Sequence, residues 1–91
     1  MAQSSTVVVE FFSIPRERAG RSELTVPAGT VSEVLAAVER ACPGLSGLVQ
    51  PDGRLSRHYL LSQGGRRFVT DVLQPLVPGE RLWLLSADAG G

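Results

Sequence analysis

The chain has 91 residues, an apolar fraction of 43% and nine acidic against nine basic side chains. This composition is typical of one folded domain, and it excludes a disordered chain and a basic surface for nucleic acid or an anionic membrane. A single cysteine, Cys42, excludes an internal disulfide and a cysteine metal set, so no metal site is predicted. No apolar run approaches the ~20 residues of a transmembrane helix and no secretory leader is evident, so we expect a cytoplasmic protein.

The first predicted elements are two strands joined by a long loop. Residues 6–12 are β-branched and aromatic, which favours a central strand. Pro15 and the charged residues 16–18 predict a loop that Gly20 closes. Residues 22–26 alternate between apolar and polar side chains, so they complete a predicted hairpin.

An amphipathic helix is predicted next. Thr30 and Glu33 have the spacing of a capping box, in which each side chain binds the other residue's amide. Residues 43–44, proline and glycine, predict the end of this helix. Apolar residues at three- and four-residue spacing predict its buried stripe: Val31, Val34, Leu35, Val38 and Cys42. Cys42 is therefore interpreted as a small buried hydrophobe and not as a reactive thiol.

Residues 57–62 predict a third strand, residues 64–65 a tight turn, and residues 66–70 a short returning strand with Phe68 directed inward. The only histidine, His58, has no second ligand at metal-binding spacing, so we expect a surface or strand-edge role.

The last predicted strand covers residues 81–86, with Leu82 and Leu84 on one face and Trp83 and Leu85 on the other. One helix covers one face of a sheet, so this element order predicts an α+β domain of two layers.

The other face of the sheet remains uncovered in this prediction. Val8, Phe12, Trp83 and Leu85 would form an apolar patch there, and such patches mark partner surfaces. Cover by the segment 45–49 is an equal alternative.

The sequence closes with a short segment of small residues. Gly90 and Gly91 lack Cβ and fit a narrow slot, and the carboxylate of Gly91 is ionised near neutral pH. The alternative is that small residues are only the usual filler of a terminus. We interpret the Gly91 carboxylate as the reactive group. Partner contacts are expected along the segment and the uncovered face, at Gly90, Ala89, Asp88, Ala87, Leu85, Trp83 and Phe12.

Four stretches together resemble the MoaD/ThiS family of ubiquitin-like sulfur carriers. These are residues 11–20, the helix start at 30–35, the turn at 76–82, and the final Gly90-Gly91. The resemblance implies a β-grasp fold, with a mixed sheet of four to five strands on one main helix. It also implies one domain over residues 1–91 with a flexible tail at 86–91.

The resemblance further implies a carrier protein that is not itself an enzyme and holds no permanent cofactor. An E1-like enzyme would adenylate Gly91 with ATP and magnesium, and sulfur would then form a thiocarboxylate. The favoured acceptor is the molybdopterin precursor, held by the large subunit of molybdopterin synthase. Alternatives are sulfur donation in cysteine, thiamin or secondary-metabolite synthesis, a ubiquitin-like modifier that forms an isopeptide, and a binding module without such chemistry.

Overall fold

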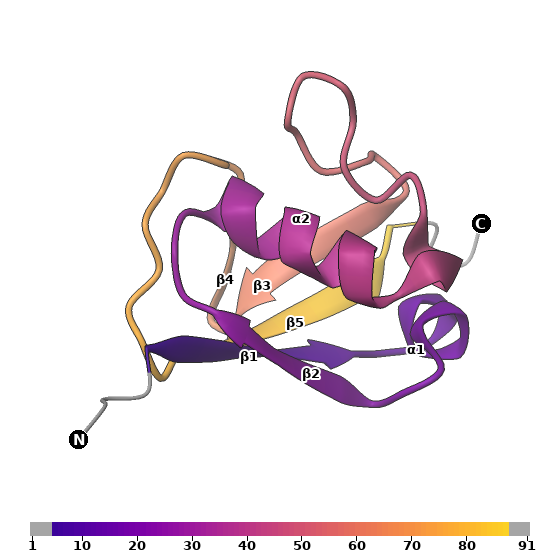
Figure 1. Ribbon diagram of the computed structural model, residues 1–91, viewed down its shortest axis with the longest axis horizontal. Coiled ribbons are helices and arrows are strands. Elements are labelled where there is room, and N and C mark those ends of the chain that lie inside the picture. Colours follow the sequence, from indigo (N-terminus) through magenta and orange to yellow (C-terminus); the bar gives the residue numbers. More distant parts are fainter. Residues whose placement is uncertain (1–4, 88–91) are drawn as a thin grey trace.

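The computed structural model describes residues 5–87, which form a five-stranded mixed sheet beside one main helix (Figure 1). The sheet order is β2-β1-β5-β3-β4. Its strands are β1 (Thr6–Phe11), β2 (Glu23–Pro27), β3 (Tyr59–Gln63), β4 (Arg67–Phe68) and β5 (Arg81–Ser86). The helices are α1 (Ile14–Ala19), α2 (Val31–Ala41) and the short 3-10 helix η1 (Pro43–Leu45). The predicted two-layer α+β domain is confirmed.

The centre of the sheet is the parallel pair β1 and β5, in which Val9 lies opposite Leu82 and Phe11 opposite Leu84. The side chains of β1 alternate between the two faces of the sheet, as predicted. On the inner face, Val7, Val9 and Phe11 are each at most 1% exposed. β2 and β3 pair antiparallel with this centre on either side. Because β1 and β5 each have two neighbours, their backbone groups are paired along both edges.

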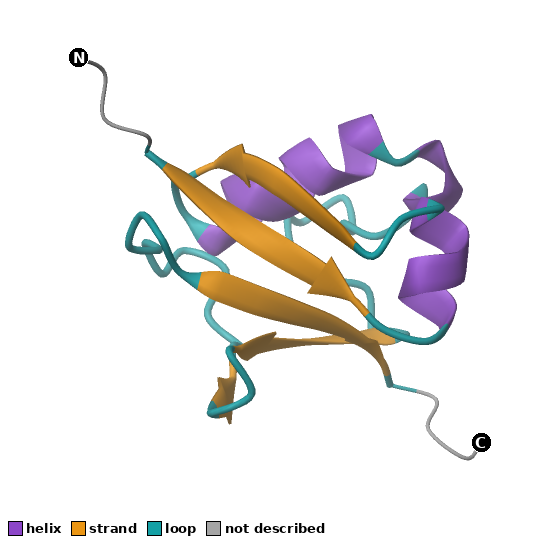
Figure 2. Cartoon of the chain, turned by 90° about the horizontal axis from the view of Figure 1, so that it is seen from below, coloured by secondary structure: helices purple, strands orange, loops and turns teal. Residues whose placement is uncertain are grey.

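The helix α2 lies on one side of the sheet (Figure 2), and its apolar stripe belongs to the same buried core as the inner residues of β1 and β5. Its start is the predicted capping box: the Glu33 amide donates to Thr30 Oγ1 over 3.2 Å, and the Thr30 amide donates to Glu33 Oε1 over 2.9 Å. The predicted stripe is buried along its whole length, including Cys42 just beyond the helix. The sequence therefore specified both the start of α2 and the face that it buries.

The segment predicted as a loop from Pro15 to Gly20 instead forms most of the helix α1. Pro15 lies in its first turn, where the missing amide hydrogen leaves no helical bond unmade. Ser13 has a positive φ of 55°, which turns the chain out of β1. Gly20 ends the helix in the left-handed region, and its amide donates to the carbonyl of Arg16 over 3.0 Å.

The predicted direction of Phe68 is wrong, because its side chain is 59% exposed. Phe68 lies opposite Ser62 in the β3–β4 ladder, and Ser62 lies opposite Trp83 in the β3–β5 ladder. Residues that face each other in a ladder share a face of the sheet, so Phe68 is on the side away from α2. Its neighbour Val69 packs against the core in its place. A shift of one residue along a strand exchanges the residues on its two faces. The prediction for this strand was shifted in this way, so it assigned Phe68 to the inner face.

The last predicted strand is confirmed, because β5 covers residues 81–86. Ser86, which the resemblance assigned to the start of the tail, therefore belongs to β5, where it lies opposite Tyr59. The Ala87 amide then donates to the His58 carbonyl over 2.9 Å. Residues 88–91 lie outside the described residues. None of the helices within residues 5–87 has the length and hydrophobicity needed to span a membrane.

The central strand β5 is expected to dominate stability. Leu84 is fully buried, so Leu84→Ala removes apolar contacts and leaves a cavity, and it should lower the free energy of unfolding by about 2–5 kcal/mol. Leu73→Ala is the matched control, since Leu73 is 73% exposed and its truncation should change stability by less than about 0.5 kcal/mol. Urea titration followed by far-ultraviolet circular dichroism measures both. Equal losses would contradict this account of the core.

Candidate functional site

The end of β5 is held from both sides. On one side the Phe12 amide donates to the Leu84 carbonyl over 3.1 Å, and on the other Ala87 is bonded to His58. α1 lies at the same end of the sheet as the last residues of β5 (Figure 1). Any segment that follows Ala87 therefore leaves the body from a fixed point. Four of the predicted site residues lie beyond it, outside the described residues: Asp88, Ala89, Gly90 and Gly91.

The face of the sheet opposite α2 carries an aromatic pair. The rings of Phe12 and Trp83 meet edge to face, with centroids 5.3 Å apart and an angle of 62° between their planes. Both side chains are half-buried, and so are Val8 and Leu85. Gly65 lies so close to the indole that a Cβ there would come within 2.6 Å of it. Trp83 is thus fixed in place by the Gly64–Gly65 turn and Phe12, as a rigid surface element.

This open face contains more apolar area than the sequence predicted. Leu60 lies opposite Leu85 and is 39% exposed, and Phe68 adds a second exposed side chain. The sequence missed both residues, although the alternation of β3 would have placed Leu60 there. The alternative prediction, that the segment 45–49 covers this face, is wrong. Leu45 and Leu48 are fully buried in the same core as the apolar stripe of α2, on the other side of the sheet.

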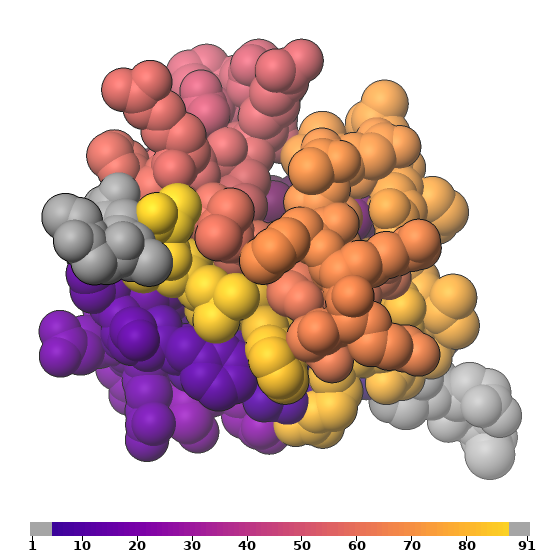
Figure 3. Space-filling model, turned by 180° about the vertical axis from the view of Figure 1, so that it is seen from behind, coloured from indigo at the N-terminus to yellow at the C-terminus, as the bar shows by residue number. Residues whose placement is uncertain are grey.

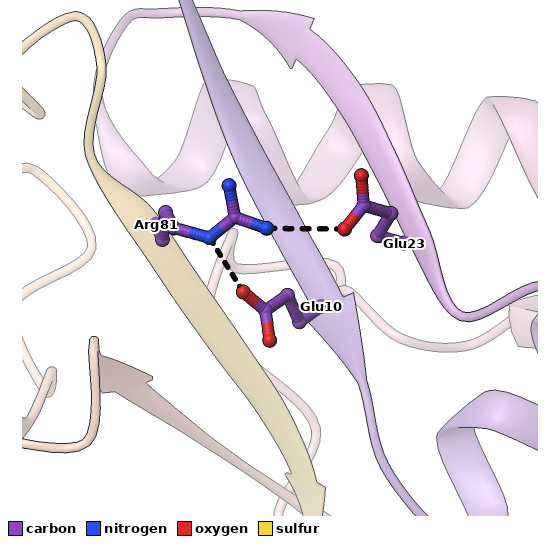
Figure 4. Close-up of polar contacts among 3 residues, drawn as sticks. All are labelled: Glu10, Glu23 and Arg81. Atoms are coloured by element: carbon purple, nitrogen blue, oxygen red, sulfur yellow. Dashed lines mark hydrogen bonds and ion pairs between the residues drawn. The ribbon is translucent and has the colours of Figure 1, made fainter.

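One cluster of charges ties three neighbouring strands together (Figure 4). Arg81 of β5 donates from Nε to Glu10 Oε2 of β1 over 2.6 Å, and from Nη2 to Glu23 Oε1 of β2 over 3.1 Å. The hydrogen bond to Glu10 raises the pKa of Arg81 above its usual value. A single guanidinium thus bridges two carboxylates, and the cluster connects β5 to β1 and β2. The sequence analysis did not identify it.

A groove of about 830 Å³, lined mainly by apolar residues, lies beside β3 on the side away from β5. It opens between residues 52–57 and 68–73, which appear in Figure 3 as salmon and orange lobes separated by a cleft. Val31 and Leu35 of α2 contribute to its lining. Its charged residues are two aspartates and two arginines, without a histidine or a cysteine. Within residues 5–87, no group of three or more histidine, cysteine, aspartate or glutamate side chains is arranged to hold a metal ion.

A smaller hollow of about 280 Å³ lies beside the end of β5, and we call it the tail-root hollow. Its lining residues come from α1, the start of β3 and the end of β5: Ile14, Arg18, His58, Tyr59 and Ser86. Arg18 Nη1 donates to the Tyr59 hydroxyl over 2.6 Å. Sequence reasoning assigned neither Arg18 nor Tyr59 to a site, because 41 residues separate them. His58 is exposed at the edge of β3, in agreement with its predicted surface position.

Known structures match the fold of this chain over nearly its whole length. SAMP1 from Haloferax volcanii superposes with a TM-score of 0.79 over 94% of this chain and 99% of its own, at 26% identity. SAMP1 from Methanosarcina acetivorans, a small archaeal modifier protein, has a TM-score of 0.78 over 99% of this chain and 100% of its own, at 22% identity.

A protein assigned as molybdopterin converting factor, subunit 1, from Pyrococcus furiosus has a TM-score of 0.72. It covers 91% of this chain and 98% of its own at 19% identity. This chain has the MoaD/ThiS-like ubiquitin fold. The β-grasp architecture expected from the sequence is therefore confirmed, with α2 as the helix that the sheet grasps. No family model matches the chain, and no curated protein matches its sequence.

The buried thiol of Cys42 gives a prediction that separates a structural cysteine from a reactive one. Only 2% of Cys42 is exposed, and burial raises the pKa of its thiol, although the charge of Arg21 lowers it in part. Iodoacetamide at pH 8 should therefore modify the folded chain at least about tenfold more slowly than the urea-unfolded chain. Mass spectrometry over time measures both rates, and equal rates would contradict the burial.

The same raised pKa predicts a stability change in alkali. The unfolded chain loses its thiol proton at a lower pH than the folded chain does, so the free energy of unfolding should fall as the pH rises through the thiol pKa of the unfolded chain. Cys42→Ala is the comparison, since this variant should lose that part of the pH dependence.

Proposed function

We propose that this chain is a ubiquitin-like sulfur carrier whose reactive group is the carboxylate of Gly91. The observation that carries the proposal is the likeness to SAMP1 over nearly the whole of both chains. It is supported by the position of Ala87, which directly follows β5, donates its amide to the His58 carbonyl and lies four residues before Gly91. The names of the structural neighbours support a carrier or a modifier, and the chemistry of sulfur loading is our proposal.

The proposed reaction starts with activation, because a carboxylate is a poor electrophile at carbon. An E1-like enzyme with ATP and magnesium transfers AMP to the Gly91 carboxylate and releases pyrophosphate. A persulfide sulfur attacks the carbonyl carbon and displaces AMP, which leaves with one of the carboxylate oxygens. A thiol then reduces the sulfur–sulfur bond, and Gly91 retains a thiocarboxylate. The carrier itself supplies no acid, base or metal in this sequence of steps.

The folded body supplies recognition in this proposal. Fixing one residue of backbone in an extended slot costs about 1–2 kcal/mol, so binding of the last residues alone is weak. The aromatic pair Phe12 and Trp83, together with Leu85, offers apolar area on the open face beside the end of β5. We assign this face to the adenylating enzyme and to the sulfur-accepting enzyme, which would bind it in turn.

The proposed acceptor is the molybdopterin precursor, held by an enzyme such as the large subunit of molybdopterin synthase. The Pyrococcus furiosus neighbour supports this choice by its name. Sulfur donation in cysteine, thiamin or secondary-metabolite synthesis would use the same Gly91 chemistry and a different acceptor enzyme. Thiocarboxylate consumption by each purified acceptor distinguishes them.

The second candidate function is protein modification through an isopeptide bond at Gly91. The two SAMP1 neighbours favour it, since one is named a small archaeal modifier protein. The target would be a lysine of another protein. This chain contains no lysine, so it has no lysine amine on which chains of itself could grow. Slow-migrating adducts in cell extracts, absent after deletion of Gly91, would support modification.

The central prediction is a change of mass. The chain incubated with its adenylating enzyme, ATP, magnesium and a persulfide donor should gain about 16 Da, as sulfur replaces one oxygen. Intact-mass spectrometry measures the gain and first establishes that Gly91 carries the free carboxylate. Deletion of Gly91 and extension by one residue should each abolish it. A gain that persists in both variants, or no gain in the parent chain, would contradict the proposal.

The open face gives a second prediction. Trp83→Ala should weaken binding to the adenylating enzyme by about tenfold or more, because a buried aromatic side chain at an interface contributes strongly to affinity. Val77→Ala is the control, since Val77 is 65% exposed in the turn before β5. Isothermal titration calorimetry measures affinity, and circular dichroism establishes that each variant is folded. Equal affinities would remove Trp83 from the interface.

A further inference from the structure

The tail-root hollow contains a cation that the fold holds in a set position. Arg18 extends from α1 to Tyr59, whose side chain is only 6% exposed. One of the five N–H groups of the guanidinium is used in this hydrogen bond, which leaves donors for a second partner. The pair connects α1 to the first residue of β3, which lies opposite Ser86 at the end of β5. Arg18, although exposed, is therefore directed by this hydrogen bond to the place where the described chain leaves the sheet.

The charge of Arg18 is not neutralised by the described chain. Within residues 5–87, ion pairs form between Arg54 and Asp52 and between Arg81 and its two glutamates, and none includes Arg18. Among residues 5–87, no acidic side chain lines the hollow. Arg16 of α1 and Arg21 just after it are close to Arg18 in sequence. Residues 14–22 thus carry three arginines and one acidic side chain, Glu17, although the whole chain has no net formal charge.

We infer that the tail-root hollow binds a carboxylate side chain of the protein that receives residues 88–91. This inference rests on the proposed function. An arginine with one edge fixed by a hydroxyl pairs well with a carboxylate, which accepts two N–H bonds side by side. A volume of about 280 Å³ is below the usual size of a small-molecule pocket and suits a single side chain. Ile14, which is 40% exposed, adds an apolar contact next to the cation.

The reach of the chain separates this contact from the chemistry at Gly91. Four fully extended residues span at most about 14 Å, and a segment inserted into an active site uses most of that length. When Gly91 is at the reacting centre, Arg18 thus lies at the mouth of the partner's channel. Arg18 is a docking residue, and its loss should change binding of the carrier without changing the chemical step.

The test is steady-state pyrophosphate release by the adenylating enzyme, with the whole chain as the varied substrate and with the persulfide donor and a thiol present to displace AMP at each turnover. Arg18→Glu should raise the KM for the carrier about tenfold or more, with kcat and the KM for ATP unchanged. Arg18→Lys should retain part of the affinity. Tyr59→Phe should give a smaller increase, because it frees the guanidinium and keeps the ring. Circular dichroism and urea titration establish that each variant folds.

The matched control is Arg66→Glu, which makes the same change of charge in the turn at the opposite end of β3. Its KM should equal that of the parent chain. An acidic residue of the enzyme near its channel mouth, changed to arginine, should restore the affinity of Arg18→Glu.

The outcomes separate the inference from the function beneath it. An equal KM for Arg18→Glu and Arg66→Glu, with normal loading of the parent chain, would overturn the docking site alone. A changed KM for ATP would also overturn it, because the hollow would then bind a phosphate of the nucleotide. Absence of pyrophosphate release from the parent chain would overturn both the docking site and the proposed function.

Discussion

The parallel pairing of β1 with β5 is the constraint on which the rest of the structure depends. It brings residues 6–11 beside residues 81–86, and the inner side chains of these two strands are almost fully buried in the core. Parallel neighbours require a long connection, and here β2, α2, β3 and β4 all lie within it. β3 then closes the other edge of β5. The last strand of the chain is thus an inner strand, and its end is a fixed point of departure.

Cover on only one side of the sheet is the second property of this arrangement. α2 buries Val34 and Val38 against the inner face, and no second helix within residues 5–87 packs on the outer one. The outer face carries the aromatic pair of Phe12 and Trp83, while Arg81 bridges the carboxylates of β1 and β2. Apolar surface of this kind suits a protein that binds partners, since an exposed apolar patch is otherwise an aggregation hazard.

The proposed division of labour follows from these two properties. The body presents its C-terminal segment from a stable strand, and it offers the open face and the tail-root hollow for recognition. Apolar contact at Trp83 gives affinity, and the fixed cation of Arg18 gives orientation, since charged contacts contribute more to specificity and approach than to raw affinity. The reactive chemistry is then carried by a carboxylate alone, with the activating groups supplied by the partner.

The sequence by itself determined the features that depend on neighbouring residues. The capping box of Thr30 and Glu33, the stripe of α2 and the two faces of β1 and β5 follow from spacings of three, four and two residues, and the structure shows all of them. Tertiary structure alone decided the direction of Phe68 and the contacts of Arg18 and Arg81. A two-residue strand such as β4 is too short to set its own phase, so its ladder with β3 sets it. Arg18 meets Tyr59 across 41 residues, and Arg81 meets Glu10 across 71, distances over which no local spacing constrains two side chains.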